Sequence, residues 1–138
     1  MFNVLVKAIS KETQDWVYGY YVNTGDVYHY VFESKIVAPF DTLSVTAHEV
    51  YPETVCVFTG KCLDNHKLYV NDIILTYEDY DDIFGYPATN EFKSIVIWDE
   101  ENFCFAFKTD DRFIQPFNDW DWEYSSYVGN VYDNYKTL

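Results

Sequence analysis

Basic residues are scarce in this chain of 138 residues. It has 9 Lys and Arg against 23 Asp and Glu, a formal net charge of −14. Such a surface repels phosphates, so we expect no direct binding of DNA or RNA. Residues 1–70 hold 8 acids and 5 bases, whereas residues 71–138 hold 15 acids and 4 bases. The excess acid keeps an aromatic-rich surface in solution, or it marks one face of the fold.

Cysteine is sparse as well. Cys56, Cys62 and Cys104 are odd in number and lack CxxC spacing, which argues against a disulfide framework or a zinc site. Reduced thiols in a cytoplasmic protein are the simplest interpretation, and Cys56, between two valines, is predicted to be a small buried hydrophobe. No run approaches the ~20 apolar residues of a membrane helix, and the N-terminus lacks a signal-peptide pattern. We therefore expect a soluble protein with no membrane association.

Features that would hold a cofactor are also missing, so none is expected. The 5 glycines form no phosphate-binding loop, and His29, His48 and His66 lack HxxxH spacing. The acidic run at 78–82 does not fit the EF-hand template, since Phe84 and Asn90 occupy its glycine and glutamate positions. A solvated loop is the preferred interpretation of that run.

Aromatic residues are abundant: 14 Tyr, 11 Phe and 4 Trp make 21% of the chain. Together with short alternating runs they favour strands. Connections too short for crossover helices favour antiparallel pairing. The sequence predicts a single mainly β domain over 1–138, with antiparallel strands in a compact sandwich or partly open barrel and at most short helical turns.

Three stretches organise this prediction. Residues 51–75 are interpreted as two strands, 55–58 and 73–75, joined by a polar loop. Residues 76–90 are predicted to be a long acidic loop, functional or mobile. Residues 92–98 and 103–108 predict a hairpin with Trp98 in the core and Phe103, Phe105 and Phe107 on one face.

Several short motifs occur in an order that resembles the YopX protein family of phages and prophages. They are Pro52-Glu53-Thr54-Val55, Phe58-Thr59-Gly60, Asp64-Asn65, Leu68-Tyr69, Asp72-Ile73-Ile74, Val96-Ile97-Trp98-Asp99 and Gly129-Asn130-Val131-Tyr132 followed by Asn134, with Lys11-Glu12-Thr13 and Trp16-Val17-Tyr18-Gly19 near the start. No single motif is specific, but their order and spacing cover most of the chain.

The resemblance implies a phage or prophage origin, a mostly β fold and a set of structural residues, but no catalytic ones. The structural set is Gly60, Asp64, Asn65, Asp72, Gly129 and Asn130. The family's Asn-Gly and Gly-Asp pairs are here Asn65-His66 and Asn71-Asp72. Asn adopts left-handed backbone more readily than most residues, so Asn71 is expected to replace the glycine with modest strain.

Two candidate sites are weighed against structural roles. Asp72 with Glu91 and Lys93 imitates the arrangement of Mg²⁺-dependent nucleases, although chance in an acidic chain and a turn-fixing role for Asp72 are favoured. Trp120 and Trp122 alternate with acids and form a candidate interaction surface, or they cap the core. The acids of that surface are Asp119, Asp121 and Glu123.

The functional prediction is a non-enzymatic accessory protein of phage or prophage origin in the bacterial cytoplasm. It acts through contact with a host or phage protein, or as a homo-oligomer. An acidic DNA mimic is the first alternative, based on carboxylates at 78–82, 99–101, 110–111 and 119–123. A Mg²⁺-dependent nuclease is the second.

Overall fold

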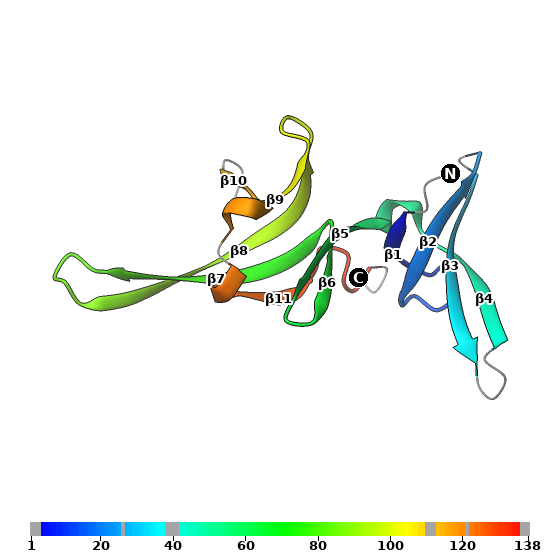
Figure 1. Ribbon diagram of the computed structural model, residues 1–138, viewed down its shortest axis with the longest axis horizontal. Coiled ribbons are helices and arrows are strands. Elements are labelled where there is room, and N and C mark those ends of the chain that lie inside the picture. Colours follow the sequence, from blue (N-terminus) through cyan, green and yellow to red (C-terminus); the bar gives the residue numbers. More distant parts are fainter. Residues whose placement is uncertain (1–3, 26, 38–41, 110–112, 121, 136–138) are drawn as a thin grey trace. The chain divides into compact units, whose positions relative to one another are not determined.

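The structure is a computed structural model and describes residues 4–25, 27–37, 42–109, 113–120 and 122–135 (Figure 1). It is 69% strand and 7% helical. The strands form two antiparallel sheets, ordered β4-β3-β2-β1-β5-β6 and β10-β9-β8-β7-β11. Both orders are linear, so the described strands do not close into a barrel. The predicted mainly β, antiparallel fold with only short helical turns is confirmed.

The contacts of the chain divide it into two compact units. Unit 1 comprises Met1–Phe58 and Asn134–Leu138, and unit 2 comprises Thr59–Asp133. The boundary falls inside one strand, β5 (Cys56–Leu63). A single domain over 1–138 stays a prediction.

Unit 1 contains four strands, one 3-10 turn and the start of β5. These elements are β1 (Leu5–Ile9), β2 (Trp16–Thr24), β3 (Tyr28–Val37), β4 (Thr42–Glu49) and η1 (Pro52–Thr54). β1 and β2 form an N-terminal hairpin, and residues 33–37 and 42–49 supply the end of β3 and all of β4.

The core of unit 1 is aliphatic. Its buried members are Val6, Ala8, Val17, Val31 and Val50. Gly19 lies in β2 where a Cβ would stand 2.1 Å from the Phe32 carbonyl oxygen, so only glycine allows β2 and β3 to approach this closely.

The Pro-Glu-Thr-Val segment has a structural role in unit 1. Thr54 is fully buried and its hydroxyl accepts a hydrogen bond from the Ile9 N–H at 2.9 Å. The same hydroxyl donates to the Tyr51 carbonyl at 2.7 Å. Because a buried N–H without a partner is costly, this threonine holds η1 against β1.

The face of β2, β3 and β4 opposite this core is apolar and exposed, and we call it the aromatic face. Strand register places every second residue of the three strands on it. Glu49 is the only charged residue that these three strands place on this face. Its large exposed members are Tyr18, Tyr20, Val22, Tyr28, Ile36, Leu43 and Val45.

Unit 2 contains the remaining strands and two 3-10 turns. They are β6 (His66–Tyr69), β7 (Asp72–Asp81), β8 (Pro87–Asp99), β9 (Cys104–Thr109), β10 (Phe113–Pro116), η2 (Phe117–Asp119), η3 (Trp122–Tyr124) and β11 (Ser125–Asn130).

The core of unit 2 is larger and partly aromatic. Its buried members are Leu63, Leu68, Ile74, Val96, Phe107 and Trp120. Phe107 is at its centre, with its ring centroid 4.3 Å from that of Trp120 and 4.7 Å from that of Phe117. Rings at such separations contribute packing energy beyond the area they bury.

The prediction of two strands joined by a loop at 51–75 is wrong. The polar middle is itself a hairpin, because Asp64 and Asn65 have positive φ values of 52° and 64° and turn β5 into β6. The two apolar runs lie in different sheets, one in β5 and the other in β7.

The predicted hairpin of β8 and β9 is confirmed, but two side chains differ from expectation. Trp98 is 46% exposed rather than buried, because it lies one residue before the end of β8 and packs edge-on against Phe105. Phe103 is 79% exposed with φ +52°, since it belongs to the turn and not to the strand. Phe105 and Phe107 do share a face, and both contact Phe117.

Candidate functional site

A two-stranded ribbon extends from unit 2 where a loop was predicted for residues 76–90. β7 and β8 pair without interruption from Ile73↔Ile95 to Asp81↔Pro87. β11 pairs with β7 only as far as Thr76, and β9 pairs with β8 only from Ile95 onward. We call residues 77–91, where each strand has only the other as its partner, the β-ribbon (Figure 1). The loop prediction is wrong because the ribbon covers no core and thus lacks regular apolar alternation.

The tip of the β-ribbon is a turn built by Asp82. Its Oδ1 accepts hydrogen bonds from the N–H groups of Phe84 and Tyr86, at 2.8 and 2.9 Å. Gly85 follows with φ +80°, a conformation that favours glycine. The turn presents Ile83 and Phe84 to solvent, with exposed fractions of 92% and 77%.

The β-ribbon combines exposed apolar groups with negative charge. Tyr77, Tyr80 and Tyr86 are exposed along it. Residues 77–91 hold five acids and no base: Glu78, Asp79, Asp81, Asp82 and Glu91. Exposed aromatic side chains are typical of protein interfaces, and like-charge repulsion between the acids disfavours contact between two copies of the ribbon.

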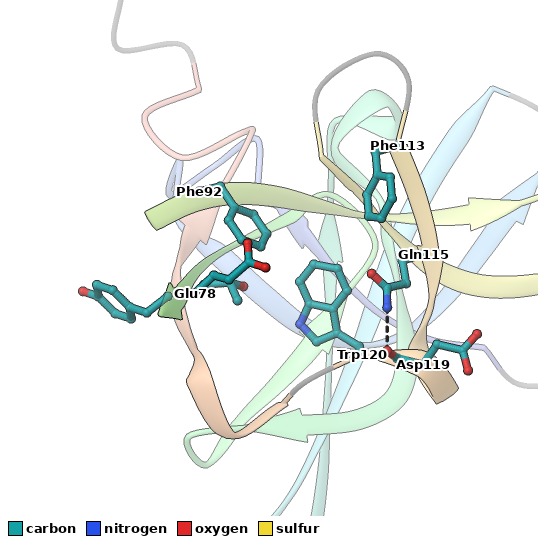
Figure 2. Close-up of a pocket in the computed structure, with 8 residues that line it drawn as sticks. Glu78, Phe92, Phe113, Gln115, Asp119 and Trp120 are labelled. Carbon is teal, nitrogen blue, oxygen red and sulfur yellow. Dashed lines mark hydrogen bonds between the residues drawn. The ribbon is translucent and has the colours of Figure 1, made fainter. Parts of the chain in front are cut away.

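A pocket of about 250 Å³ opens at the base of the β-ribbon (Figure 2). Figure 2 shows Trp120 between Phe92 and Gln115, with Phe113 above. The pocket is smaller than the ~300–1,000 Å³ of usual small-molecule sites, so it has room for a single side chain. Its lining residues are Thr76, Tyr77, Glu78, Phe92, Phe113, Gln115, Asp119 and Trp120.

Trp120 is held rigidly at the floor of this pocket. Its indole N–H donates to the Ser125 hydroxyl at 2.9 Å, and that hydroxyl lies 2.9 Å from the Thr76 hydroxyl. Phe92 meets the indole edge-on, with ring centroids 6.3 Å apart. Because the ring is fixed by β7, β8 and β11 partners, the pocket is preformed.

The predicted interaction surface divides into buried rings and exposed acids. Trp120 is only 7% exposed, and the half-buried Trp122 lies with its ring centroid 5.3 Å from Phe107, so both rings cap the core as the alternative held. Asp119 and Glu123 are exposed. Asp121 lies outside the described residues. The exposed apolar surface that the sequence interpretation missed is the β-ribbon tip, for which the Asp82-to-Gly85 turn was the available signal.

The structural residues named from the resemblance form two groups in unit 2. Asp72 is fully buried and accepts hydrogen bonds from the Tyr69 N–H and the Asn130 side-chain amide, both at 2.8 Å. Asn71 has φ +77°, the left-handed conformation predicted for it. Gly129 lies at the bulge of β11, where a Cβ would stand 2.7 Å from an Asp133 carboxylate oxygen.

The second group is at the β5–β6 hairpin. Asp64 and Asn65 form its turn, and Gly60 has φ +86° within β5. His66 begins β6 and does not have positive φ. These residues therefore shape the backbone at and near the β5–β6 turn.

The nuclease residues are not brought together. Glu91 pairs with Tyr77, which lies five positions along β7 from Asp72. Glu91 is therefore about 17 Å from Asp72 along the strand and on the opposite face of the strand pair. Asp72 is directed at a turn, as expected. Within the described ranges, no group of three or more His, Cys, Asp or Glu is placed to hold a metal ion.

The carboxylates considered for DNA mimicry lie in separate places. Those of 78–82 are on the β-ribbon, where Glu78 pairs with Asn90 of β8. Asp99, at the other end of β8, is about 30 Å from Asn90 along the strand, and Glu100 and Glu101 follow it. Asp110 and Asp111 lie outside the described residues.

The thiols and the absence of spanning helices complete the description. Cys56 is fully buried as predicted, Cys62 is exposed and Cys104 is half-buried, all as free thiols. None of the helical segments in the described part of the chain has the length and apolar character to cross a membrane.

No protein-family model, curated protein or solved structure matches this chain. Membership of the YopX family therefore stays a prediction from the motifs.

Proposed function

We propose that this chain is a non-enzymatic binding protein that contacts a partner protein through the β-ribbon. The observation that carries the proposal is the exposure of Ile83 and Phe84, at 92% and 77%, on a turn fixed by Asp82. Large apolar side chains held outward on a defined turn lose little entropy on binding and are frequent interface anchors.

The motif resemblance extends the proposal to origin and setting. A protein similar to the YopX family would be a phage- or prophage-derived accessory protein acting in the bacterial cytoplasm. Its partner would then be a host or phage protein.

A matched pair of variants tests the role of the tip. Phe84→Asp places a charge on the tip, while Phe103→Asp makes the same change at an equally exposed turn of unit 2, where Phe103 is 79% exposed. Tagged wild type and both variants are incubated with bacterial lysate, and captured proteins are quantified by mass spectrometry. We expect Phe84→Asp to capture at least about tenfold less of each partner than wild type and Phe103→Asp do, as for a hot-spot side chain.

Equal capture by all three proteins would contradict the proposal, as would equal loss in both variants. Capture is repeated at low and high salt. Contact through the apolar tip persists at high salt, because screening weakens charge attraction and leaves apolar burial intact.

An acidic DNA mimic is the second candidate, favoured by the concentration of charge in unit 2. Residues 59–133 hold 16 acids and 5 bases, whereas the rest of the chain holds 7 acids and 4 bases. A mimic would compete with DNA for its partner, and its capture would be lost at high salt. Release of every partner at high salt would favour this function over the first.

A further inference from the structure

The pocket at the base of the β-ribbon is lined by negative and aromatic groups and, among its described lining residues, by no base. Glu78 supplies a carboxylate, while Asp119 lines the pocket with its carboxylate directed away from Trp120 (Figure 2). Among the described bases, the nearest along the strands face away: Lys93 pairs with Leu75, on the face opposite Phe92, and Lys108 pairs with Ile114, on the face opposite Gln115. Arg112, which precedes Phe113, lies outside the described residues. The described lining residues therefore carry negative charge and no base to compensate it.

Aromatic rings form the rest of the pocket. Trp120 is the floor, and Phe92 and Phe113 are beside and above it (Figure 2). Phe113 is 54% exposed, so the pocket is open on that side. Ring faces attract cations, most strongly those of tryptophan. The combination selects a positively charged ligand over an anion or a sugar.

The polar groups at the rim are acceptors. The Gln115 side-chain N–H donates to the Asp119 carbonyl, which leaves the Gln115 amide oxygen as the acceptor. Glu78 has no hydrogen-bond or ion-pair partner among the described residues, and Figure 2 shows its carboxylate on the Phe92 side of Trp120. Two acceptors on either side of a ring suit a planar donor group.

We propose that this pocket binds the guanidinium group of an arginine side chain presented by the partner protein. A guanidinium stacks on aromatic rings and directs its N–H groups outward in one plane, whereas an ammonium is a compact, strongly hydrated point charge. Glu78 and the Gln115 amide oxygen accept from its edges. This inference rests on the proposed function, because the arginine belongs to the protein that the β-ribbon tip contacts.

The pocket is tested on the free protein with N-acetyl-arginine-N-methylamide as the probe. The tryptophan indole N–H signals are followed by ¹H–¹⁵N NMR, and that of Trp120 is assigned by single Trp→Phe replacement of Trp16, Trp98 and Trp122. We expect saturable shifts of the Trp120 signal with a Kd in the millimolar range, about what one cation–π contact with one charge-assisted hydrogen bond supports. The capped lysine binds more weakly, and the neutral capped citrulline does not shift the signal.

A charge-matched pair of variants locates the effect. Glu78→Gln removes the pocket carboxylate, and we expect the affinity for the arginine probe to fall about tenfold. Glu91→Gln removes another exposed acid from the same ribbon, on the face opposite Phe92, and is expected to change the affinity less than about twofold. Both positions are exposed, so folding is not at risk.

Three results would overturn the inference: no shift of the Trp120 signal, an equal response to capped citrulline, or equal affinity of the two variants. These outcomes are independent of the capture experiment. Probe binding combined with unchanged capture by Phe84→Asp would refute the tip contact and leave the arginine pocket standing, and the reverse pattern would refute the pocket alone.

Discussion

The two units each extend a two-stranded ribbon beyond the strands that support it, and the two ribbons differ in charge. In unit 1, β2 pairs with β3 only as far as Phe32, so β3 and β4 continue alone. Their exposed apolar residues Ile36, Leu43 and Val45 lie on the almost uncharged aromatic face. In unit 2, the β-ribbon carries five acids on 15 residues.

The difference shows two ways of exposing apolar side chains. On the β-ribbon, acids are interspersed with tyrosines and the large aliphatic and Phe side chains are concentrated at one turn, which suits contact with a basic partner. On the aromatic face the apolar groups are spread over a flat sheet. β4 is an edge strand that has no second strand partner within the described ranges, and Thr42–Ala47 contains no charge to protect it from pairing.

The cores differ too, and the largest expected effect tests whether the units are independent. Phe107→Ala removes the central ring of unit 2 and should cost about 3–5 kcal/mol of unfolding free energy. We expect hydrogen-exchange protection to be lost from β7 to β11 and retained in β1 to β4. Val31→Ala, a fully buried site of unit 1, is the reciprocal change.

Equal loss of protection in both units with either variant would contradict this expectation. It would instead support one cooperative domain over 1–138.

Each unit has a buried polar residue that satisfies backbone donors, and the second prediction compares them. The Asp72 carboxylate accepts two hydrogen bonds, and in Asp72→Asn the new amide N–H would face one of those two donors. Thr54→Val removes the hydroxyl that accepts from the Ile9 N–H. Each should cost about 1–3 kcal/mol, with Asp72 at the upper end because its hydrogen bonds are charge-assisted. Urea denaturation measures both.

Asp81→Asn, at an exposed site on the same strand as Asp72, is the control and should change stability by less than about 0.5 kcal/mol. A loss as large as that of Asp72→Asn would mean that removing charge, rather than a buried acceptor, caused the effect.

Glycines in the two units are expected to respond differently to alanine. Gly19→Ala in unit 1 places Cβ 2.1 Å from the Phe32 carbonyl oxygen, so β2 and β3 must separate, at a cost of about 1–3 kcal/mol. Gly60→Ala in unit 2 meets no atom within 4 Å but has φ +86°, so only backbone strain of about 1–2 kcal/mol is expected. Thermal unfolding ranks them, and a larger effect at Gly60 would contradict the close strand approach.

The smallest effect is a pH dependence at the β8–β9 turn. The Asn102 side-chain amide, followed by the Glu101 backbone N–H, holds the pKa of Asp99 below its usual 3.8. The ionised form is thus favoured in the folded state, so its stabilisation is present above about pH 4 and is lost as the pH falls through the lowered pKa.

Asp99→Asn should flatten the pH dependence of unfolding below about pH 4. Glu101→Gln, which removes an exposed carboxyl from the same turn, is the matched control. The counterpart in unit 1 is Glu33, whose pKa the Lys35 ammonium lowers. Identical curves for wild type and Asp99→Asn would remove the assigned role of Asn102.

Local signals were enough for much of the fold. The alternation in 92–98 and 103–108 predicted the β8–β9 hairpin, because strand periodicity depends only on neighbouring residues. Asn71 was correctly assigned a left-handed backbone conformation for the same reason. The sequence interpretation failed at 76–90. There the two strands pair only with each other and neither face is buried, so the sequence shows no alternation of apolar and polar residues.

The candidate site needed the tertiary structure. Phe92, Phe113 and Trp120 come from three separate segments and meet only because β10 folds back on β9 and the chain then returns to β11 beside β7. Nothing in their spacing distinguishes a pocket wall from a core residue.

Composition and local pattern alone determined that this protein is acidic, aromatic and mainly antiparallel β, since strand propensity and turn chemistry act over a few residues. Only the tertiary structure decided which rings are buried and which are presented. Burial depends on packing between segments far apart in the chain, so Trp120 lies in the core while Phe84 lies in solvent.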